Sequence, residues 1–287
     1  MLANFLRRAF VAVIGFALLF VLGYYGDLCI FLPVAALAAI GMGEYYSAMY
    51  RKGLRPSIGW GYLCGLTLLA VAWFGSNIGR DERLLACLFA TVTISLVVQF
   101  TQRKDQSAVI NSAITTFGVV YVALLMSYLL RLRTLDVPVL LGHPDAGQFA
   151  HRMGAVLLVM VPVWLGGDTF GYLVGNKWGR HKLCPTISPG KTVEGSIGNL
   201  SGTLLLTLIL GGLWLKLPFP NCLAIGLIMG TIGQVGDLAK SALKRDLGIK
   251  DFGGIFGAHG GVIDRFDALL FVMPLVYWYL KLVFLVA

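Results

Sequence analysis

The sequence predicts an all-α polytopic membrane protein with about nine transmembrane helices. Of its 287 residues, 57% are hydrophobic and only 13% are charged, whereas soluble domains are about 45–50% apolar and about 25% charged. The mean hydropathy is +0.80. The apolar residues form runs of the length that a membrane-spanning helix needs, roughly 20 residues. This composition excludes a disordered chain, a secreted disulfide-rich domain and most soluble enzymes.

Charged and turn residues separate the apolar runs in the first half of the chain. The first run, 8–25, follows Arg7 and Arg8 as in a signal peptide, but no clear cleavage site of small residues comes after it. We therefore expect it to be a retained helix. Glu44 is the main ionisable residue here, and it is either an interfacial carboxylate in an aromatic belt or a support for packing or for a site. Four more spans are expected at 28–50, 57–76, 84–101 and 108–130.

The second half of the chain contains the remaining apolar runs and most of the unusual polar residues. We expect residues 1–287 to form one membrane domain, in which 1–150 is a lipid-facing scaffold and 151–287 contains the functional site. The connection at about 131–152 has several prolines and glycines and is expected to be a loop. The last four spans are expected at 153–175, 195–216, 219–239 and 265–286.

The basic residues predict the orientation of these spans. With the N-terminus in the cytoplasm and nine alternating spans, the cytoplasmic segments contain 16 Lys and Arg and the opposite side contains 7. Membrane proteins concentrate basic residues on the cytoplasmic side. Nine of the 16 lie in two polar segments, 176–194 and 240–265. We therefore interpret much of the net charge of +9 as a surface that binds phosphate groups, not nucleic acid.

The first polar region combines an acid within an apolar run with a basic loop. Asp168 lies inside the sixth run, where an ionisable group is costly, so it is either functional or paired with a basic residue on a neighbouring helix. Ser188, Lys191 and Thr192 precede a predicted helix, whose free N–H groups favour a phosphate. Thr192 alone could equally be a helix cap. The sequence lacks the first glycine and the preceding strand of a P-loop.

The second polar region brings carboxylates and cations to neighbouring helix ends. On a helix, Asp237, Ser241 and Lys244 share one face. Asp264 and Asp267 are three residues apart at the start of the last span. Close carboxylates need a cation or an arginine between them, and Arg265 could neutralise one of them.

A cation at these acids would be a hard metal ion. The aspartates offer oxygen ligands without neighbouring His or Cys, which suits Mg²⁺. Residues 250–261 are rich in glycine and form a loop that could let the backbone approach a ligand. Within that loop we expect His259 to form hydrogen bonds and shape the loop, not to act as a general base.

Two motifs resemble the phosphatidate cytidylyltransferases, which are CDP-diacylglycerol synthases. Over 27 residues, 241–267, the chain has the signature residues of that family. A second stretch, 168–195, resembles the family's other polar segment. The first motif consists of Ser241, Lys244, Arg245, Lys250, Asp251, Gly253, Phe256, Gly257, His259, Gly260, Gly261, Asp264, Arg265 and Asp267.

The resemblance implies a reaction of CTP with phosphatidate that yields CDP-diacylglycerol and pyrophosphate. It also implies Mg²⁺, a second cation such as K⁺, and a homodimer in a bacterial inner membrane with the site on the cytoplasmic side. Asp237 and Asp264 become the main metal ligands, with Asp168 and Asp267 as supporting ligands. The residues expected to bind substrates are Ser188, Lys191, Thr192, Ser241, Arg245, Lys250 and His259. The catalytic set is Asp237, Asp264, Asp267, Lys244 and Arg265.

Physical reasoning leaves two other functions open. A CTP-dependent polyprenol or lipid kinase would use similar groups, but it would transfer the γ-phosphate to a hydroxyl group and release CDP. An ion-coupled transporter would also have buried acids, although its site should lie near the middle of the membrane and not at one face.

Overall fold

Long helices occupy the intervals in which the sequence predicts membrane spans. The structure, a computed structural model, describes residues 24, 27–75, 79–100, 107–143, 145–257 and 260–285. The predicted span 8–25 lies outside the described residues, and each of the other eight predicted spans coincides with a helix. The prediction of an all-α polytopic membrane protein is therefore confirmed.

The first half of the described chain consists of helices joined by short connections. One long helix is continuous from Ala108 to Arg133, because its α-helical ends flank a wider π-helical stretch. The elements are α2 (Asp27–Arg51), α3 (Ile58–Phe74), α4 (Arg80–Phe100), α5 (Ala108–Gly118), η1 (Val119–Leu124), α6 (Leu125–Arg133) and the short α7 (Val137–Leu140).

The second half adds four long helices and one small hairpin. The elements are α8 (Gln148–Val161), η2 (Pro162–Asp168), α9 (Thr169–Trp178), β1 (Lys182–Cys184), β2 (Ser188–Thr192), α10 (Val193–Thr207), η3 (Leu208–Trp214), α11 (Phe219–Leu247) and α12 (Val262–Leu285). The π-helical stretch η2 ends at Asp168, and such stretches are frequent at functional sites. The hairpin was not predicted from the sequence.

Six of the described helices are long and apolar enough to cross a membrane. Helix α3 is apolar but shorter, and α4 begins with four charged residues, Arg80 to Arg83. The protein is thus an integral membrane protein. The six helices are Leu28–Arg51, Ala108–Arg133, Gln148–Trp178, Val193–Trp214, Phe219–Leu247 and Val262–Phe284.

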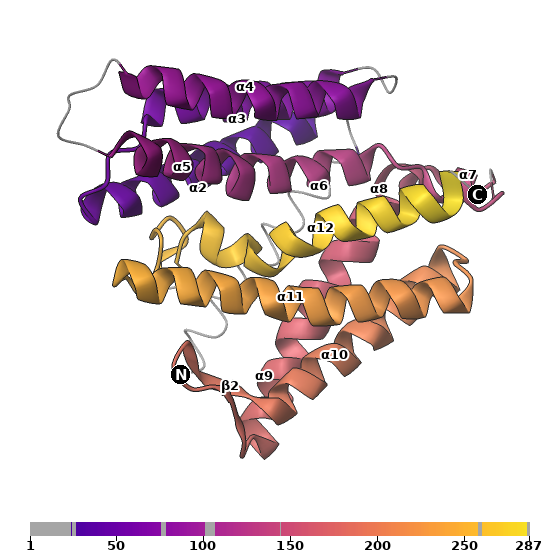
Figure 1. The fold of residues 1–287 in the computed structure, drawn as a ribbon. Coiled ribbons are helices and arrows are strands. Elements are labelled where there is room, and N and C mark those ends of the chain that lie inside the picture. Colours follow the sequence, from indigo (N-terminus) through magenta and orange to yellow (C-terminus); the bar gives the residue numbers. More distant parts are fainter. Residues whose placement is uncertain are drawn as a thin grey trace.

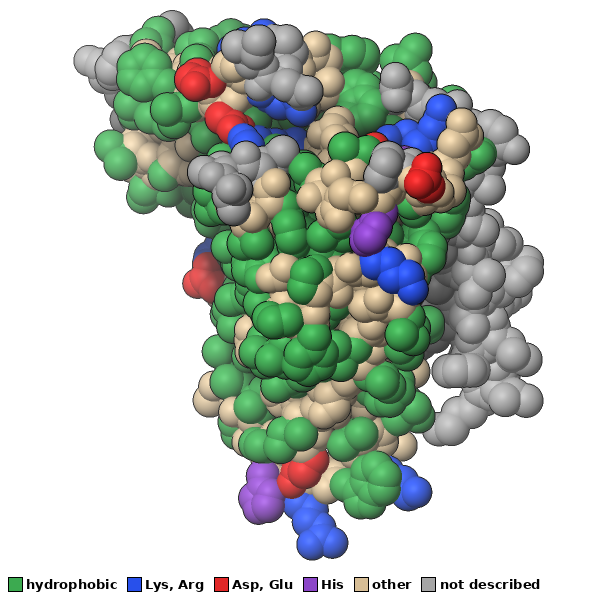
Figure 2. All heavy atoms as spheres, turned by 90° about the vertical axis from the view of Figure 1, so that its right-hand side faces the viewer, with side chains coloured by type: hydrophobic (Ala, Val, Ile, Leu, Met, Phe, Trp, Pro, Cys, Tyr) green, Lys and Arg blue, Asp and Glu red, His purple; other side chains and the backbone are tan. Residues whose placement is uncertain are grey.

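The helices form layers around a central pair. Helices α11 and α12 run side by side, with α2 to α6 on one side of them and α9 and α10 on the other (Figure 1). The core between α2, α6, α8 and α12 includes Met42, Leu129 and Leu269, all of them buried. Large apolar side chains such as Leu173 and Leu213 are exposed. One face of the molecule is mostly hydrophobic with a few charged groups (Figure 2), as expected for a surface in contact with lipid.

Close packing of small residues holds the layer that contains the hairpin. A methyl group on Gly166 would lie 2.6 Å from the backbone oxygen of Gly202, so η2 and α10 touch through their backbones. Membrane helices approach each other in this way where glycines meet, because lipid provides no hydrophobic drive for helix association. The contact holds the helix that contains η2 and α9 against α10, and α10 in turn packs against α11.

A buried arginine ties α4, α6 and α12 together at the end of the bundle away from the hairpin. The side chain of Arg131 is only 2% exposed and forms an ion pair with Asp81. It donates to the Tyr277 hydroxyl at 3.1 Å and lies 4.8 Å from the centre of the Tyr128 ring. Lys281 reaches the second oxygen of Asp81 at 2.7 Å. Burial alone would raise the pKa of Asp81, but the hydrogen bond from Lys281 and the charge of Arg131 hold it below its ordinary value.

Candidate active site

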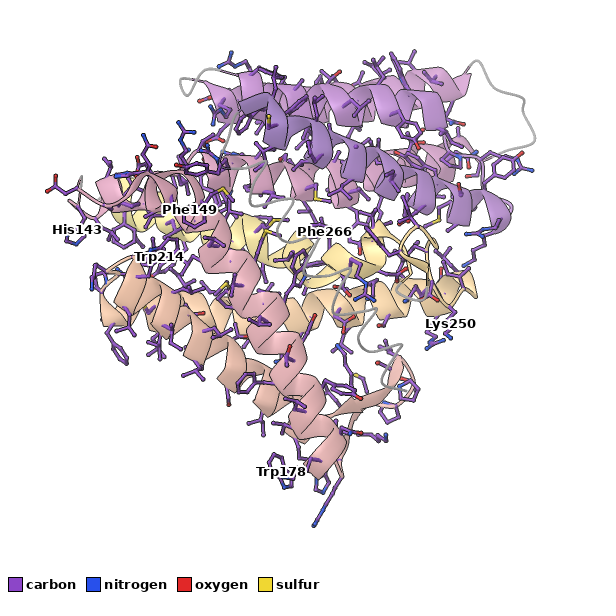
Figure 3. The ribbon with its side chains drawn as sticks, turned by 180° about the vertical axis from the view of Figure 1, so that it is seen from behind. His143, Phe149, Trp178, Trp214, Lys250 and Phe266 are labelled. Carbon is purple, nitrogen blue, oxygen red and sulfur yellow. The ribbon has the colours of Figure 1, made fainter. Side chains whose placement is uncertain are left out.

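The two polar segments meet at one end of the bundle. The side chain of Arg245, near the end of α11, donates to the backbone oxygen of Ile187 in the hairpin at 3.3 Å. Lys250 lies at this end, whereas His143 lies at the opposite end of the molecule (Figure 3). Residues 176–194 and 240–264 therefore build one surface, as their shared basic character predicts.

The hairpin positions the first group of predicted residues. Strands β1 and β2 are antiparallel and pair Lys182 with Thr192 and Cys184 with Ser188. Thr192 begins α10, and its hydroxyl accepts a hydrogen bond from the Gly195 amide at 3.1 Å. Thr192 is thus a helix cap, and it also lines the neighbouring pocket.

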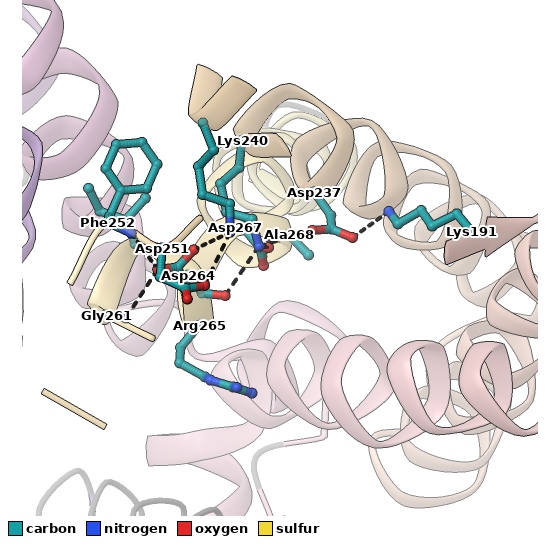
Figure 4. Close-up of polar contacts among 12 residues, drawn as sticks. Lys191, Asp237, Lys240, Asp251, Phe252, Gly261, Asp264, Arg265, Asp267 and Ala268 are labelled. Carbon is teal, nitrogen blue, oxygen red and sulfur yellow. Dashed lines mark hydrogen bonds and ion pairs between the residues drawn. The ribbon is translucent and has the colours of Figure 1, made fainter. Parts of the chain in front are cut away.

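A chain of lysines and aspartates crosses from the hairpin through α11 to α12. Lys191 of β2 forms an ion pair with Asp237 of α11. The Lys240 ammonium, one helical turn further on, lies 3.0 Å from the other oxygen of Asp237 and also binds Asp267 of α12. The Lys240 side chain is only 9% exposed. Figure 4 shows this chain of contacts. Lys240 therefore lies between Asp237 and Asp267 and offsets the repulsion between their charges.

Asp264 belongs to a second, adjacent cluster. One oxygen accepts from Lys244 at 2.8 Å. The other accepts from the backbone amides of Phe252 at 2.9 Å and Gly261 at 3.1 Å. Asp251 lies 3.6 Å from the same lysine. These three contacts come from a positive charge and two amide dipoles, which stabilise the charged form of the Asp264 carboxylate.

The antiparallel packing of α11 and α12 explains why neighbouring aspartates have different partners. Asp264 pairs with Lys244. Asp267, which lies further along α12, pairs with Lys240, which lies earlier along α11. Each step is about one helical turn. The four side chains therefore form two rungs of a ladder between the helices.

A cavity of about 450 Å³ opens beside this ladder, within the range of small-ligand sites. Its charged lining is Asp168, Lys182, Lys191 and Asp237. Neutral polar groups from α10 and α11 continue the lining. Asp168 is exposed toward this space, and no ion pair of Asp168 is found within the ranges that the structure describes.

The arrangement of the aspartates fits only one of the usual ways in which proteins bind Mg²⁺. Among the residues that the structure describes, no three His, Cys, Asp or Glu side chains converge as ligands of one metal ion. However, Mg²⁺ commonly keeps several waters and binds through one or two carboxylates together with substrate phosphates. Asp168 and Asp237 line the same cavity and fit that mode. Both oxygens of Asp237 hold ammonium groups, so a metal ion would have to displace one.

The other predicted residues lie around these clusters at different distances. Arg265 is exposed and extends away from Asp264 and Asp267 toward the helix that contains η2 (Figure 4). Ser188 and Ser241 are half-buried, and Lys250 is exposed. His259 lies outside the described residues.

The predicted set of site residues lacks Lys240, which has the most contacts with aspartates in the cluster. Its signal in the sequence is its place three residues after Asp237, the spacing at which opposite charges on a helix meet. The predicted set also omits Asp251, although that residue belongs to the motif.

Comparison with known proteins identifies the family. The profile of the cytidylyltransferase family matches residues 6–283. The chain belongs to the cytidylyltransferase family. A phosphatidate cytidylyltransferase of Synechocystis sp. is 31% identical over 96% of this chain and 96% of that protein. The enzyme of the same name from Bacillus subtilis is 34% identical over 72% of this chain and 70% of its own length.

This cytidylyltransferase also matches other relatives over a shorter stretch. A phosphatidate cytidylyltransferase of Staphylococcus saprophyticus is 43% identical over 42% of this chain and 46% of that protein. The family that the two sequence motifs predict is thus confirmed, and the chain is an enzyme. The clusters around Asp237 and Asp264 are its candidate active site.

Proposed function

We propose that this cytidylyltransferase transfers the cytidylyl group of CTP to phosphatidate, forming CDP-diacylglycerol and pyrophosphate. The observation that carries the proposal is the cavity lined by Lys191, Asp168 and Asp237 at one end of a bundle of apolar helices. Such a place is open to a water-soluble nucleotide and close to a lipid. The names of the Synechocystis and Bacillus relatives support the same substrates.

The reaction needs charge neutralisation more than proton transfer. A phosphate monoester has a second pKa of about 6, so phosphatidate is largely a dianion at neutral pH and needs no strong base. One of its phosphate oxygens forms a bond to the α-phosphorus of CTP. The bond from that phosphorus to the bridging oxygen breaks, and the electron pair leaves with pyrophosphate. Bringing two polyanions together is the main barrier, and cations lower it.

We propose that the lysines and the arginine supply that charge. Lys191 is 27% exposed beside the cavity and can exchange its bond with Asp237 for a bond with a phosphate oxygen. Lys244 forms an ion pair with Asp264. Arg265 is exposed and extends toward η2, and we assign it the binding of a phosphate group on that side. Ser188, Thr192, Ser241, Arg245, Lys250 and His259 are proposed to contribute to substrate binding.

Magnesium is proposed as the cofactor. Asp237 and Asp168 would hold it, with Asp264 and Asp267 as further candidates for a second cation such as K⁺. The bound ion would neutralise charge on the triphosphate and on the leaving pyrophosphate. The aspartates that remain paired with Lys240 and Lys244 would keep those ammonium groups in place.

We also propose a homodimer in a bacterial inner membrane with the active site facing the cytoplasm. The distribution of basic residues supports that orientation, and CTP is a cytoplasmic, water-soluble substrate. The family resemblance supports the dimer. Light scattering in detergent, corrected for bound detergent, should give twice the chain mass of 31.1 kDa, and a mass of one chain would contradict the dimer.

The test is product analysis with purified protein in detergent. With CTP, phosphatidate and Mg²⁺ we expect CDP-diacylglycerol and pyrophosphate, and no product when diacylglycerol or polyprenol replaces phosphatidate. Phosphorylation of a hydroxyl lipid with release of CDP would instead indicate a kinase. Ion flux across sealed vesicles without nucleotide, and no lipid product, would indicate a transporter.

A further inference from the structure

Glu44 of α2 reaches the start of α12, which lies 218 residues further along the chain. One carboxylate oxygen accepts from the Val262 amide at 3.0 Å, and the other accepts from the Ile263 amide at 3.1 Å. Amides in the first turn of a helix have no partner within the helix. A carboxylate at that end is also favoured by the helix dipole. Glu44 therefore caps α12 from a distant part of the chain.

Two glycines of the loop before α12 close around this carboxylate. A methyl group at Gly253 would overlap the Oε1 atom of Glu44, and a methyl group at Gly261 would overlap both of its oxygens. Any larger residue at either position would push the carboxylate away from the amides of α12. The glycines at these two positions are therefore explained by contact with Glu44, and no ligand is needed to explain them.

Gly261 also links Glu44 to the active-site cluster. Its amide donates to Asp264 at 3.1 Å, so the residue is held between two carboxylates. Asp264 in turn binds Lys244, and Asp267 follows one turn later on α12 and binds Lys240. A shift of the first turn of α12 would therefore move both rungs of the ladder between α11 and α12. Glu44 does not line the cavity.

We propose that Glu44 is a positioning residue, which holds the start of α12 together with Gly253 and Gly261 so that Asp264 and Asp267 face their lysines. This inference rests on the proposed function, because one of its tests measures CDP-diacylglycerol synthesis. Through Glu44, the N-terminal half of the chain would help to position the aspartates of the site.

Graded variants of Glu44 test this role. Glu44→Gln keeps one carbonyl acceptor for the two amides, and Glu44→Leu keeps none. We expect CDP-diacylglycerol synthesis per folded protein to fall about tenfold for Gln and about 100-fold for Leu, because hydrogen bonds to a charged group contribute more than those between neutral groups. Gly261→Ala should reproduce the loss by displacing the same carboxylate. Asp136→Asn is the matched control, since Asp136 caps α7 through the Val139 amide and should leave activity unchanged.

Hydrogen exchange measured by mass spectrometry separates positioning from general instability. In Glu44→Gln we expect amides of residues 250–266 to exchange about fivefold faster or more, with α10 unchanged. Faster exchange throughout the protein, or unchanged exchange at 250–266 with full activity, would overturn the proposal. If wild-type protein makes no CDP-diacylglycerol, the proposed function fails, while the exchange result still decides whether Glu44 holds this end of α12.

Discussion

Replacing Lys240 with methionine tests whether one buried ammonium group holds two carboxylates together. The variant keeps a side chain of similar length but removes the charge that lies 3.0 Å from Asp237 and contacts Asp267. At 3.0 Å and an effective dielectric constant of about 20, each such contact has a Coulomb energy of roughly 5 kcal/mol. The net loss is smaller, about 3–5 kcal/mol, which is typical when one partner of a buried pair is removed.

Thermal unfolding in detergent measures this effect. A loss of about 3 kcal/mol should lower the midpoint of unfolding by about 6–12 °C. The double variant Lys240→Met/Asp267→Asn should recover part of that loss, because it removes one of the two carboxylates left without a counter-charge. Lys177→Met is the control: this exposed lysine should change stability by no more than about 0.5 kcal/mol. A Lys240→Met protein that melts within 1 °C of wild type would refute the electrostatic role of Lys240.

Three further predictions concern single residues. Asp264→Asn should lower CDP-diacylglycerol synthesis by about 100-fold or more while the protein stays monodisperse in detergent, and near-wild-type synthesis would contradict its place in the site. Lys191→Ala should raise the KM for CTP about tenfold, and an unchanged KM would mean that the hairpin only anchors α10. Asp81→Asn should lower the unfolding temperature at neutral pH. Since the pKa of Asp81 is lowered in the fold, its contribution is present above the ordinary value and disappears as the pH falls. The difference from wild type should therefore shrink toward pH 3, and a constant difference would contradict it.

The sequence predicts the helices well because each needs about 20 apolar residues to cross a membrane. Eight predicted spans coincide with helices, and the ends differ by a few residues where polar turns extend beyond the membrane. Helix α11, for example, continues to Leu247, well past the predicted end at 239. The small hairpin is not predicted, because Pro185 and Pro189 interrupt any strand-like alternation.

The sequence predicts which residues form the site, but it does not predict which side chains pair with each other. Scarce acids within apolar runs single out Asp168, Asp237 and Asp264, because such groups are costly in lipid. Which lysine each aspartate meets depends on how α11 and α12 are rotated against each other, and a single sequence does not contain that rotation. The contact between Glu44 and the start of α12 is less predictable still, because it joins residues that are 218 positions apart.

The most direct test of the central claim is to follow the phosphates of CTP separately. Purified protein is given phosphatidate and Mg²⁺ with CTP that is labelled at either the α- or the γ-phosphate. Cytidylyl transfer predicts that the α-label appears in CDP-diacylglycerol and the γ-label in pyrophosphate. A γ-label found in the lipid, or no α-label in the lipid, would contradict the account.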